Sequence, residues 1–255
     1  MKKYVLELEN KLNSLPKRTS KQIPESYIGG GQSKLKYIGL RVPDLRKIIN
    51  KGFSFSNVDE EKLVKILDYI WWNSNCYEVI SISLSWFYDS KNRSRLKLYW
   101  PILKKWSKKI DNWAHSDTLS GIYSRILEDD QKLIYPTLVK WNSSTNPWIR
   151  RLSIISLLYY SSQRKKYLPF EKIILLLNDQ IEFDHYYVQK GVGWTLRETY
   201  NVYPEKTFKY IKENVLKLTS VAFSSATEKM TSKEKNLLKK IRKTARFQLS
   251  NTPDK

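Results

Sequence analysis

Apolar residues recur along this chain with the three-to-four-residue spacing of amphipathic helices. Tyr4, Leu8, Leu12 and Leu15 mark a first helix that ends near Pro16. The same spacing predicts further helices at 75–89, 93–110, 115–127, 131–141, 146–160, 169–178, 184–201, 204–215, 218–229 and 231–248. Because the helical signal runs nearly throughout the chain, an all-α fold is expected.

Two of the expected helices begin with a clear local signal. Pro43 suits the first position of a helix whose apolar face holds Leu45, Ile48 and Ile49. The next helix is expected to start at Asn57, because Asn is a good N-cap and the acids that follow it suit the first turn of a helix.

Helices of roughly 10–17 residues alternate with short loops, so helix pairs recur about every 35–40 residues, as in HEAT and armadillo arrays. The expected architecture is a right-handed α-solenoid of about six to seven HEAT-like helix pairs. It forms a single domain over 1–255, with an N-terminal helical cap at 1–31 and a basic C-terminal helix at 232–250. A plain helical bundle is the alternative, but a dozen or so short helices do not make a simple four-helix bundle.

The charge balance points to a phosphate-rich partner. Lys and Arg total 46 against 25 Asp and Glu, which gives a net charge of +21. Such an excess favours nucleic acid, because each neutralised phosphate releases counterions. The alternatives are a basic surface that serves solubility alone and binding to an anionic membrane.

Several other classes of protein are disfavoured. Cys76 is the only cysteine, so no intrachain disulfide is expected, and the two histidines, His115 and His185, lie far apart with no ligand-spaced cluster around them. His115 is expected at the surface or in a helix cap. No signal peptide, membrane-spanning run, phosphate-binding loop or dinucleotide motif is present, so a cytoplasmic, nucleoid-associated protein with no metal and no cofactor is expected.

Two aromatic–charged pairs are the candidate chemistry. Trp113 and Asp117 lie four residues apart and share a face if the segment is helical, and Trp194 precedes Arg197 by three. Aromatic faces and one anion in a basic background suit a cationic group on a polyanion, such as an alkylated base in DNA. The alternatives are that Asp117 only stabilises a helix start, that both tryptophans belong to the core, and that Arg151 is a solvated surface charge.

Four segments carry motifs that agree in order and spacing with one known family. They are 37–46 (YIGLRVPDLR), 113–117 (WAHSD), 146–151 (NPWIRR) and 188–198 (VQKGVGWTLRE). They resemble the Gly-x-x-x-Pro-x-x-Arg, Trp-x-x-x-Asp, Trp-x-x-Arg and Gln-Lys-x-x-x-Trp-x-Leu-Arg-Glu signatures of the AlkD-type bacterial DNA alkylation repair glycosylases. The last signature is the most specific.

The resemblance implies a curved array of HEAT-like repeats with a basic concave face that holds duplex DNA. The implied activity is excision of N3- and N7-alkylated purines by hydrolysis of the N-glycosidic bond, with no metal or cofactor, by a monomer. Asp117 corresponds to the catalytic carboxylate, and Trp113 and Trp194 to the two cleft tryptophans. Further candidate DNA contacts in the matching region are Arg151, Arg197, Tyr27, Arg150 and Lys190.

One stretch departs from the family pattern: residues 218–227 replace a more basic segment, which leaves the substrate range open. The main competing hypothesis is a non-catalytic DNA- or RNA-binding scaffold of the same fold. A protein-binding helical adaptor is a third hypothesis, and it predicts a weak salt dependence of DNA binding, whereas a charge of +21 predicts a steep one.

Overall fold

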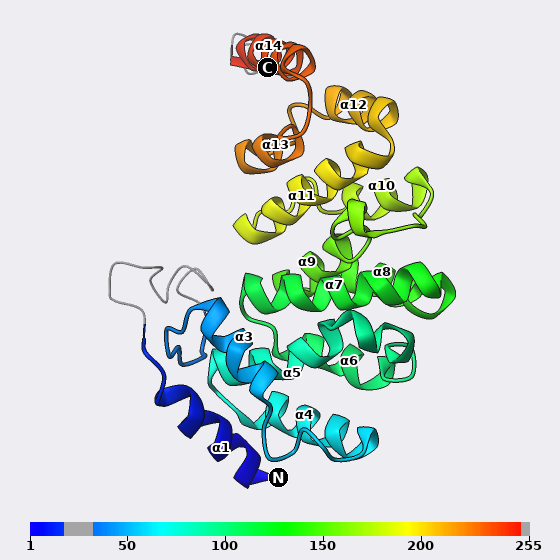
Figure 1. Cartoon of the computed structure of the whole chain (residues 1–255). Helices are drawn as coiled ribbons and strands as arrows, with labels where there is room; N and C mark the ends of the chain where they lie inside the picture. Colours follow the sequence, from blue (N-terminus) through cyan, green and yellow to red (C-terminus); the bar gives the residue numbers. More distant parts are fainter. Residues whose placement is uncertain (18–32, 251–255) are drawn as a thin grey trace. The chain divides into compact units, whose positions relative to one another are not determined.

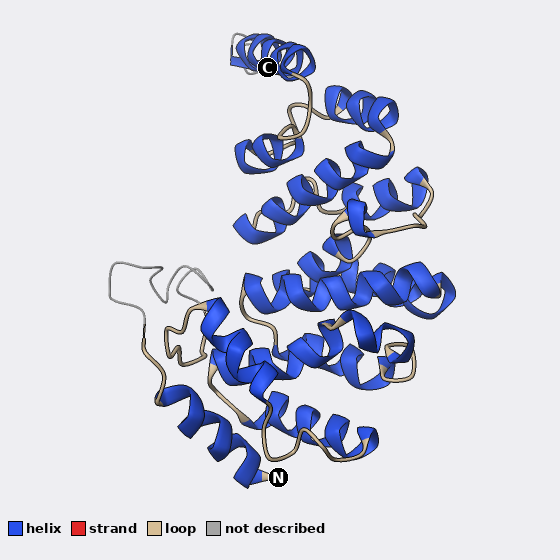
Figure 2. Ribbon diagram, viewed as in Figure 1, coloured by secondary structure: helices blue, strands red, loops and turns tan. Residues whose placement is uncertain are grey.

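The computed structural model describes residues 1–17 and 33–250, and within these ranges the chain is helical (Figure 2). No strand occurs in the described ranges, where a single bridge pairs Lys36 with Cys76. The α-helices are α1 (Lys2–Asn13), α3 (Val42–Lys51), α4 (Glu60–Asn73), α5 (Tyr77–Tyr88), α6 (Trp100–Trp106), α7 (Trp113–Asp129), α8 (Gln131–Asn142), α9 (Pro147–Ile155), α10 (Phe170–Asn178), α11 (Tyr186–Val202), α12 (Pro204–Glu213), α13 (Ser220–Ala226) and α14 (Ser232–Ser250) (Figure 1). The predicted all-α fold is therefore confirmed.

Two local predictions were wrong. The helix expected at 93–110 is broken into the 3-10 turn η1 (Ser90–Arg95), α6 and the 3-10 turn η2 (Ser107–Lys109). Pro101 lies in the first turn of α6, and a proline has no N–H with which to continue a preceding helix. The N-cap of α4 is Asp59, two residues beyond the expected Asn57, because its side chain accepts a 2.9 Å hydrogen bond from the Lys62 N–H.

The N-terminal cap predicted at 1–31 is described only in part. Its first helix is present as α1, which buries Val5, Leu8 and Leu12. The remainder of the predicted cap, from residue 18 onward, lies outside the described residues. The proline of the next helix, Pro43, lies in the first turn of α3 as expected.

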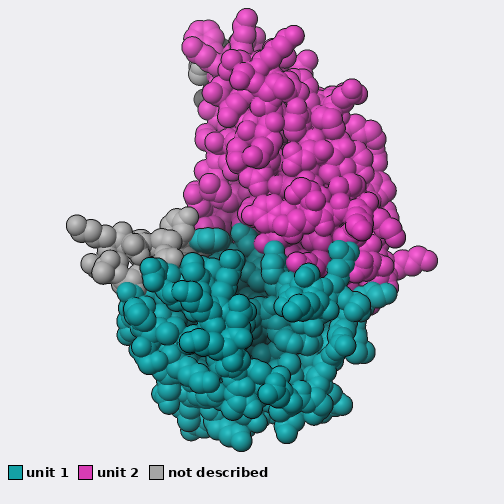
Figure 3. All heavy atoms as spheres, viewed as in Figure 1, with its two compact units in different colours: residues 1–119 teal, residues 120–255 magenta. Residues whose placement is uncertain are grey.

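The chain forms two compact units, Met1–Leu119 and Ser120–Lys255, and the boundary falls within α7 (Figure 3). In unit 1, α1, α4 and α5 pack together around fully buried apolar side chains such as Leu8 and Ile70. Trp71 of α4 stacks on Trp106 of α6, with ring centroids 4.5 Å apart.

Unit 2 is built from helices that repeat at a nearly constant interval. α11 packs against both α9 and α13, and α10 lies against both α8 and α12 (Figure 1). The polar contacts between successive repeats join residues about one repeat apart: Tyr135 to Lys172 at 37 residues, Trp194 to Tyr159 at 35, and Tyr210 to Asn178 at 32. This spacing confirms the predicted helical-repeat fold.

α11 and α13 cross at Gly193, where the backbones approach closely. A Cβ atom added at Gly193 would lie 2.6 Å from both the carbonyl oxygen of Ala222 and the Cβ of Ser225. The unusual 218–227 stretch therefore supplies small residues that α11 requires, and α13 buries Ala222, Phe223 and Ala226.

The predicted basic C-terminal helix is present as α14. Thr231 and Glu234 close its first turn by reciprocal hydrogen bonds, and Leu238 and Arg242 are buried. The Arg242 guanidinium donates to the carbonyl oxygen of Leu218 at 2.6 Å. The exposed cations of the helix are Lys233, Lys239, Lys240, Lys243 and Arg246.

None of the described helices combines the length and the apolar character that a membrane crossing requires.

Candidate functional site

Trp113 and Asp117 lie on the first turns of α7, one turn apart on the same face, as the spacing predicted. The side chain of Asn112 accepts a 2.9 Å hydrogen bond from the His115 N–H and so caps the start of this helix. Trp113 is half-buried and Asp117 is 8% exposed. Asp117 is therefore a largely buried acid on the helix face that also carries Trp113.

The expectation that His115 lies at the surface was wrong, because only 3% of this residue is exposed. Its ring stacks on Tyr77, with centroids 4.4 Å apart and planes 8° from parallel. The Asn112 amide lies 3.2 Å from Nδ1, and the Ser81 hydroxyl lies 2.9 Å from Nε2. The helical spacing placed His115 on a defined face of α7 but did not reveal that α5 covers that face.

The hydrogen-bond network defines the tautomer of His115. The Ser81 hydroxyl donates to the carbonyl oxygen of Tyr77 at 2.8 Å, so it must accept from Nε2–H. Nδ1 then accepts from the Asn112 amide, whose oxygen is already used by the helix cap. Burial lowers the pKa of His115 to about 4, so the ring is neutral near pH 7.

Asp117 influences its surroundings through its charge. Burial raises the pKa of Tyr77, and the nearby negative charge of Asp117 is among the smaller influences that raise it further. Tyr37 packs edge-on against Tyr77, with ring centroids 5.2 Å apart. The start of α7 thus combines the Asp117 carboxylate with aromatic rings and a neutral imidazole, and a second carboxylate, Asp111, lies just before the helix.

Two carboxylates of this region bind the chain between residues 33 and 40, which leads into and includes part of the first family-like segment. Glu78 of α5 accepts hydrogen bonds from the N–H groups of residues 38–40, at 3.0, 2.8 and 3.3 Å. Asp111 accepts from the Ser33 hydroxyl at 3.0 Å and from the Lys34 N–H at 2.8 Å. Gly39 has a φ of 85°, a conformation that side chains with a Cβ rarely adopt.

Glu78 was missed by the sequence analysis, although a signal for it was present. It is a lone acid among the apolar residues of α5 and is 2% exposed. A buried carboxylate requires donors, and the chain supplies three backbone N–H groups.

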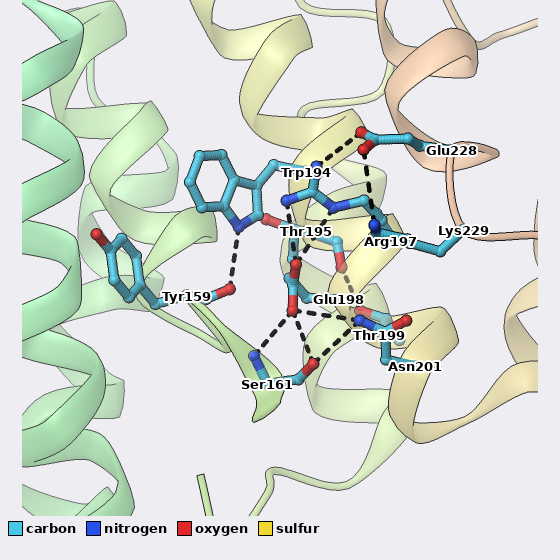
Figure 4. Close-up of polar contacts among 10 residues, drawn as sticks. All are labelled: Tyr159, Ser161, Trp194, Thr195, Arg197, Glu198, Thr199, Asn201, Glu228 and Lys229. Carbon is cyan, nitrogen blue, oxygen red and sulfur yellow. Dashed lines mark hydrogen bonds and ion pairs between the residues drawn. The ribbon is translucent and has the colours of Figure 1, made fainter. Parts of the chain in front are cut away.

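In unit 2, Trp194 of α11 is held on several sides (Figure 4). Its indole N–H donates to the carbonyl oxygen of Tyr159 at 3.0 Å, and its ring stacks on the Tyr159 ring at 5.8 Å. The Arg197 guanidinium lies over the Trp194 ring, 5.1 Å from the centroid. Trp194 is half-buried, and a cation of the protein itself already lies against the ring.

Glu198 holds the turn that Trp194 contacts. Its carboxylate accepts from the N–H and hydroxyl of Ser161, at 2.8 and 2.7 Å, and it is 4% exposed. Tyr159, just before this turn, has a φ of 43°, which is strained for a residue with a side chain. Trp194 and Glu198 together stabilise this conformation by binding the turn at residues 159 and 161.

Arg197 is paired with two carboxylates. Its guanidinium donates to Glu198 Oε1 at 3.1 and 3.2 Å and to Glu228 Oε2 at 2.8 Å. Burial by itself would lower the pKa of Arg197, but the hydrogen bonds and charges of Glu228 and Glu198 outweigh it and raise the pKa. Glu228 was not singled out from the sequence, because it lies 31 residues from Arg197 with no motif around it.

The other predicted cations differ in their surroundings. Arg151 is 3% exposed and donates to the carbonyl oxygen of Tyr187, which excludes the alternative of a solvated surface charge. Arg150 donates to the Ser144 carbonyl and to Gln180 and lies 4.2 Å from the Phe183 ring centroid. Lys190 is exposed on α11. Tyr27 lies outside the described residues.

The structure thus brings Trp113 and Asp117 onto one helix face in unit 1, and Trp194 and Arg197 into contact in unit 2. Among the described residues, no group of three His, Cys, Asp or Glu side chains is arranged to hold a metal ion.

The repeat geometry defines the class of the protein as an all-α helical-repeat protein. A family model described as DNA alkylation repair enzyme matches residues 8–230, most of the chain. The protein therefore belongs to the family of DNA alkylation repair enzymes. The matched segment ends just before α14.

Two solved structures share the fold. A predicted DNA alkylation repair enzyme from Enterococcus faecalis is 14% identical, with a TM-score of 0.56, over 78% of this chain and 90% of that chain. AlkD2 from Streptococcus mutans is 18% identical, with a TM-score of 0.52, over 94% of this chain and 96% of that chain. No curated protein matches the sequence.

Proposed function

We propose that the protein is a DNA glycosylase that hydrolyses the N-glycosidic bond of cationic N3- and N7-alkylated purines in duplex DNA. The observation that carries the proposal is the position of Asp117, a carboxylate 8% exposed to solvent on the same helix face as Trp113. Membership in the DNA alkylation repair family supports it.

Hydrolysis of the N-glycosidic bond of an alkylated purine requires mainly a negative charge placed near the deoxyribose. Alkylation at N3 or N7 makes the purine a cation and a good leaving group. As the glycosidic bond breaks, positive charge develops on the deoxyribose, and the Asp117 carboxylate would stabilise it. The same carboxylate would orient the attacking water and accept its proton. Low exposure strengthens this electrostatic effect, because less water screens the charge.

The surroundings of Asp117 suit this role. His115 is neutral near pH 7, so no imidazolium on the same helix turn competes with the substrate for the carboxylate. The half-buried Trp113 offers an indole to a cationic nucleotide, an attraction of about 0.5–2 kcal/mol. We propose that Trp194 also contacts a nucleotide of bound DNA, as the family resemblance implies.

DNA binding would draw on the basic surface. The net charge of +21 and the exposed cations of α14 favour a polyanion. We propose that four cations either contact the DNA backbone or support residues that do: Arg197, Arg151, Arg150 and Lys190. The competing function is a non-catalytic DNA- or RNA-binding scaffold, in which Asp117 only shapes the surface.

Base release separates the two functions. Duplex DNA with N7-methylguanine or N3-methyladenine is incubated with wild type, Asp117→Asn and Asp179→Asn, and the free base is measured at matched DNA occupancy. Asp179 is an exposed carboxylate at the end of α10, so its variant controls for the loss of one charge. We expect release by wild type and by Asp179→Asn, and a loss of about 100-fold or more in Asp117→Asn. Salt-sensitive binding without release of either base by wild type would favour the scaffold.

A further inference from the structure

The cation that the family resemblance assigns to the DNA backbone is not free in unit 2. Arg197 is 15% exposed in its side chain and divides its donors between Glu198 and Glu228 (Figure 4). The two carboxylates neutralise the one guanidinium, so the group carries no excess positive charge toward a phosphate.

The two partners of Arg197 differ in how firmly they are held. Glu198 is buried, with a side chain 5% exposed, and also accepts from Ser161 and Asn201, so it cannot leave without breaking several hydrogen bonds. Glu228 has a side chain 51% exposed and lies between the end of α13 and the start of α14. Beyond Arg197, its carboxylate has weaker interactions, with Lys229 at 4.0 Å and with the charge of Lys235.

The exchangeable partner is therefore Glu228. Its pKa is lowered, chiefly by the hydrogen bond from Arg197, so it is ionised at neutral pH and competes as an anion. Because half of the Glu228 side chain is exposed, solvent screens its pairing with Arg197 and weakens it. A backbone phosphate offers the same guanidinium an oxygen pair of matching geometry, and its single negative charge is part of a polyanion whose binding releases counterions.

We propose that Glu228 occupies the position of a DNA phosphate: it holds Arg197 against Trp194 in the DNA-free protein and is replaced by a backbone phosphate when DNA binds. Glu228 is then a residue that tunes DNA affinity by competition, and Arg197 becomes available only where a phosphate displaces it. This inference rests on the DNA partner of the proposed function but not on its base-release chemistry.

The competition also bears on Trp194. Arg197 lies 5.1 Å from the Trp194 ring centroid, and the Glu228 bond helps to keep it there. A guanidinium that turns toward a phosphate would leave that ring face open to a cationic nucleotide. Binding of the DNA backbone and exposure of the indole would thus be one event.

A double-mutant cycle on DNA affinity tests the inference. The Kd for undamaged duplex DNA is measured for wild type, Glu228→Gln, Arg197→Gln and the double variant, and thermal unfolding checks that each is folded at the assay temperature. We expect Glu228→Gln to bind about fivefold more tightly, the equivalent of one exposed ion pair. In the Arg197→Gln background the same substitution should have no effect beyond that of a general charge change.

Glu213→Gln measures that general charge effect. Glu213 is similarly exposed, at 58% of its side chain, and is paired with Lys209 at 3.9 Å in the same unit. An equal gain in DNA affinity in Glu213→Gln and Glu228→Gln would overturn the inference. So would a gain in affinity from Glu228→Gln that persists in the Arg197→Gln background, or a loss of affinity in Glu228→Gln. If wild type binds DNA without releasing bases, only the proposed activity fails. If it does not bind DNA, both proposals fail.

Discussion

The two candidate groups, Asp117 in unit 1 and Arg197 in unit 2, have contrasting surroundings. Asp117 lies at the start of α7, two residues after His115. His115 is neutral and is hydrogen-bonded to Asn112 and Ser81. Arg197 lies between two carboxylates, one buried and one half-exposed. The Asp117 carboxylate thus shares its helix turn with a neutral, hydrogen-bonded histidine, whereas the Arg197 guanidinium belongs to an ionic network in which Glu228 is the more exposed partner.

The two groups are suited to different functions, one to catalysis and the other to DNA binding. A group that stabilises developing charge must be in place before the reaction, because reorganisation would cost part of its effect. A group that binds a phosphate must exchange an existing partner for a new one. The hydrogen-bonded start of α7 is suited to stabilising developing charge, and the Arg197–Glu228 pair is suited to binding a phosphate.

The largest expected effect comes from the two glycines that shape these regions. In Gly193→Ala the new Cβ would lie 2.6 Å from backbone and side-chain atoms of α13, and we expect a loss of about 3 kcal/mol in the free energy of unfolding. Gly39→Ala meets no atom within 4 Å but is strained at a φ of 85°, and we expect a loss of about 1–2 kcal/mol. Urea denaturation measures both, and equal losses would contradict the close α11–α13 crossing.

A smaller effect should appear in the pH dependence of stability. His115 has a folded pKa of about 4 against 6.5 for the ordinary residue, so between these values the unfolded chain binds a proton that the folded chain does not. Stability therefore falls as pH drops from 6.5 to 4, by up to about 3 kcal/mol. His115→Gln, which does not titrate, should lose less stability than wild type between pH 7 and pH 5. Identical slopes would mean that the ring is not held neutral.

Much of the fold could be predicted from the sequence, because helices reveal themselves by local spacing. Asp117 and Trp113 could be placed on one face for the same reason. The burial of His115 and Arg151 could not be predicted, because helical periodicity does not say which neighbour covers a polar side chain. Pro101, by contrast, was a local signal for the break in 93–110 that the apolar periodicity obscured.

The Arg197–Glu228 pair shows the limit most clearly. Its members are 31 residues apart, and Glu228 belongs to no motif. Their contact depends on how closely α13 approaches α11, which Gly193 and Ala222 determine by their lack of bulk. A resemblance that assigns Arg197 to DNA does not reveal that a carboxylate already binds it.

The most direct test of the account compares the rate of base release with DNA affinity in Asp117→Asn and Arg197→Gln. Single-turnover release of N7-methylguanine at saturating protein gives the rate, and a binding titration gives the Kd. We expect Asp117→Asn to lose about 100-fold or more in rate with a Kd within about twofold of wild type. Arg197→Gln should bind several-fold more weakly and release bases at a near-normal rate once saturated. A full rate in Asp117→Asn, or parallel losses of rate and affinity in both variants, would contradict the division between a catalytic carboxylate and a binding guanidinium.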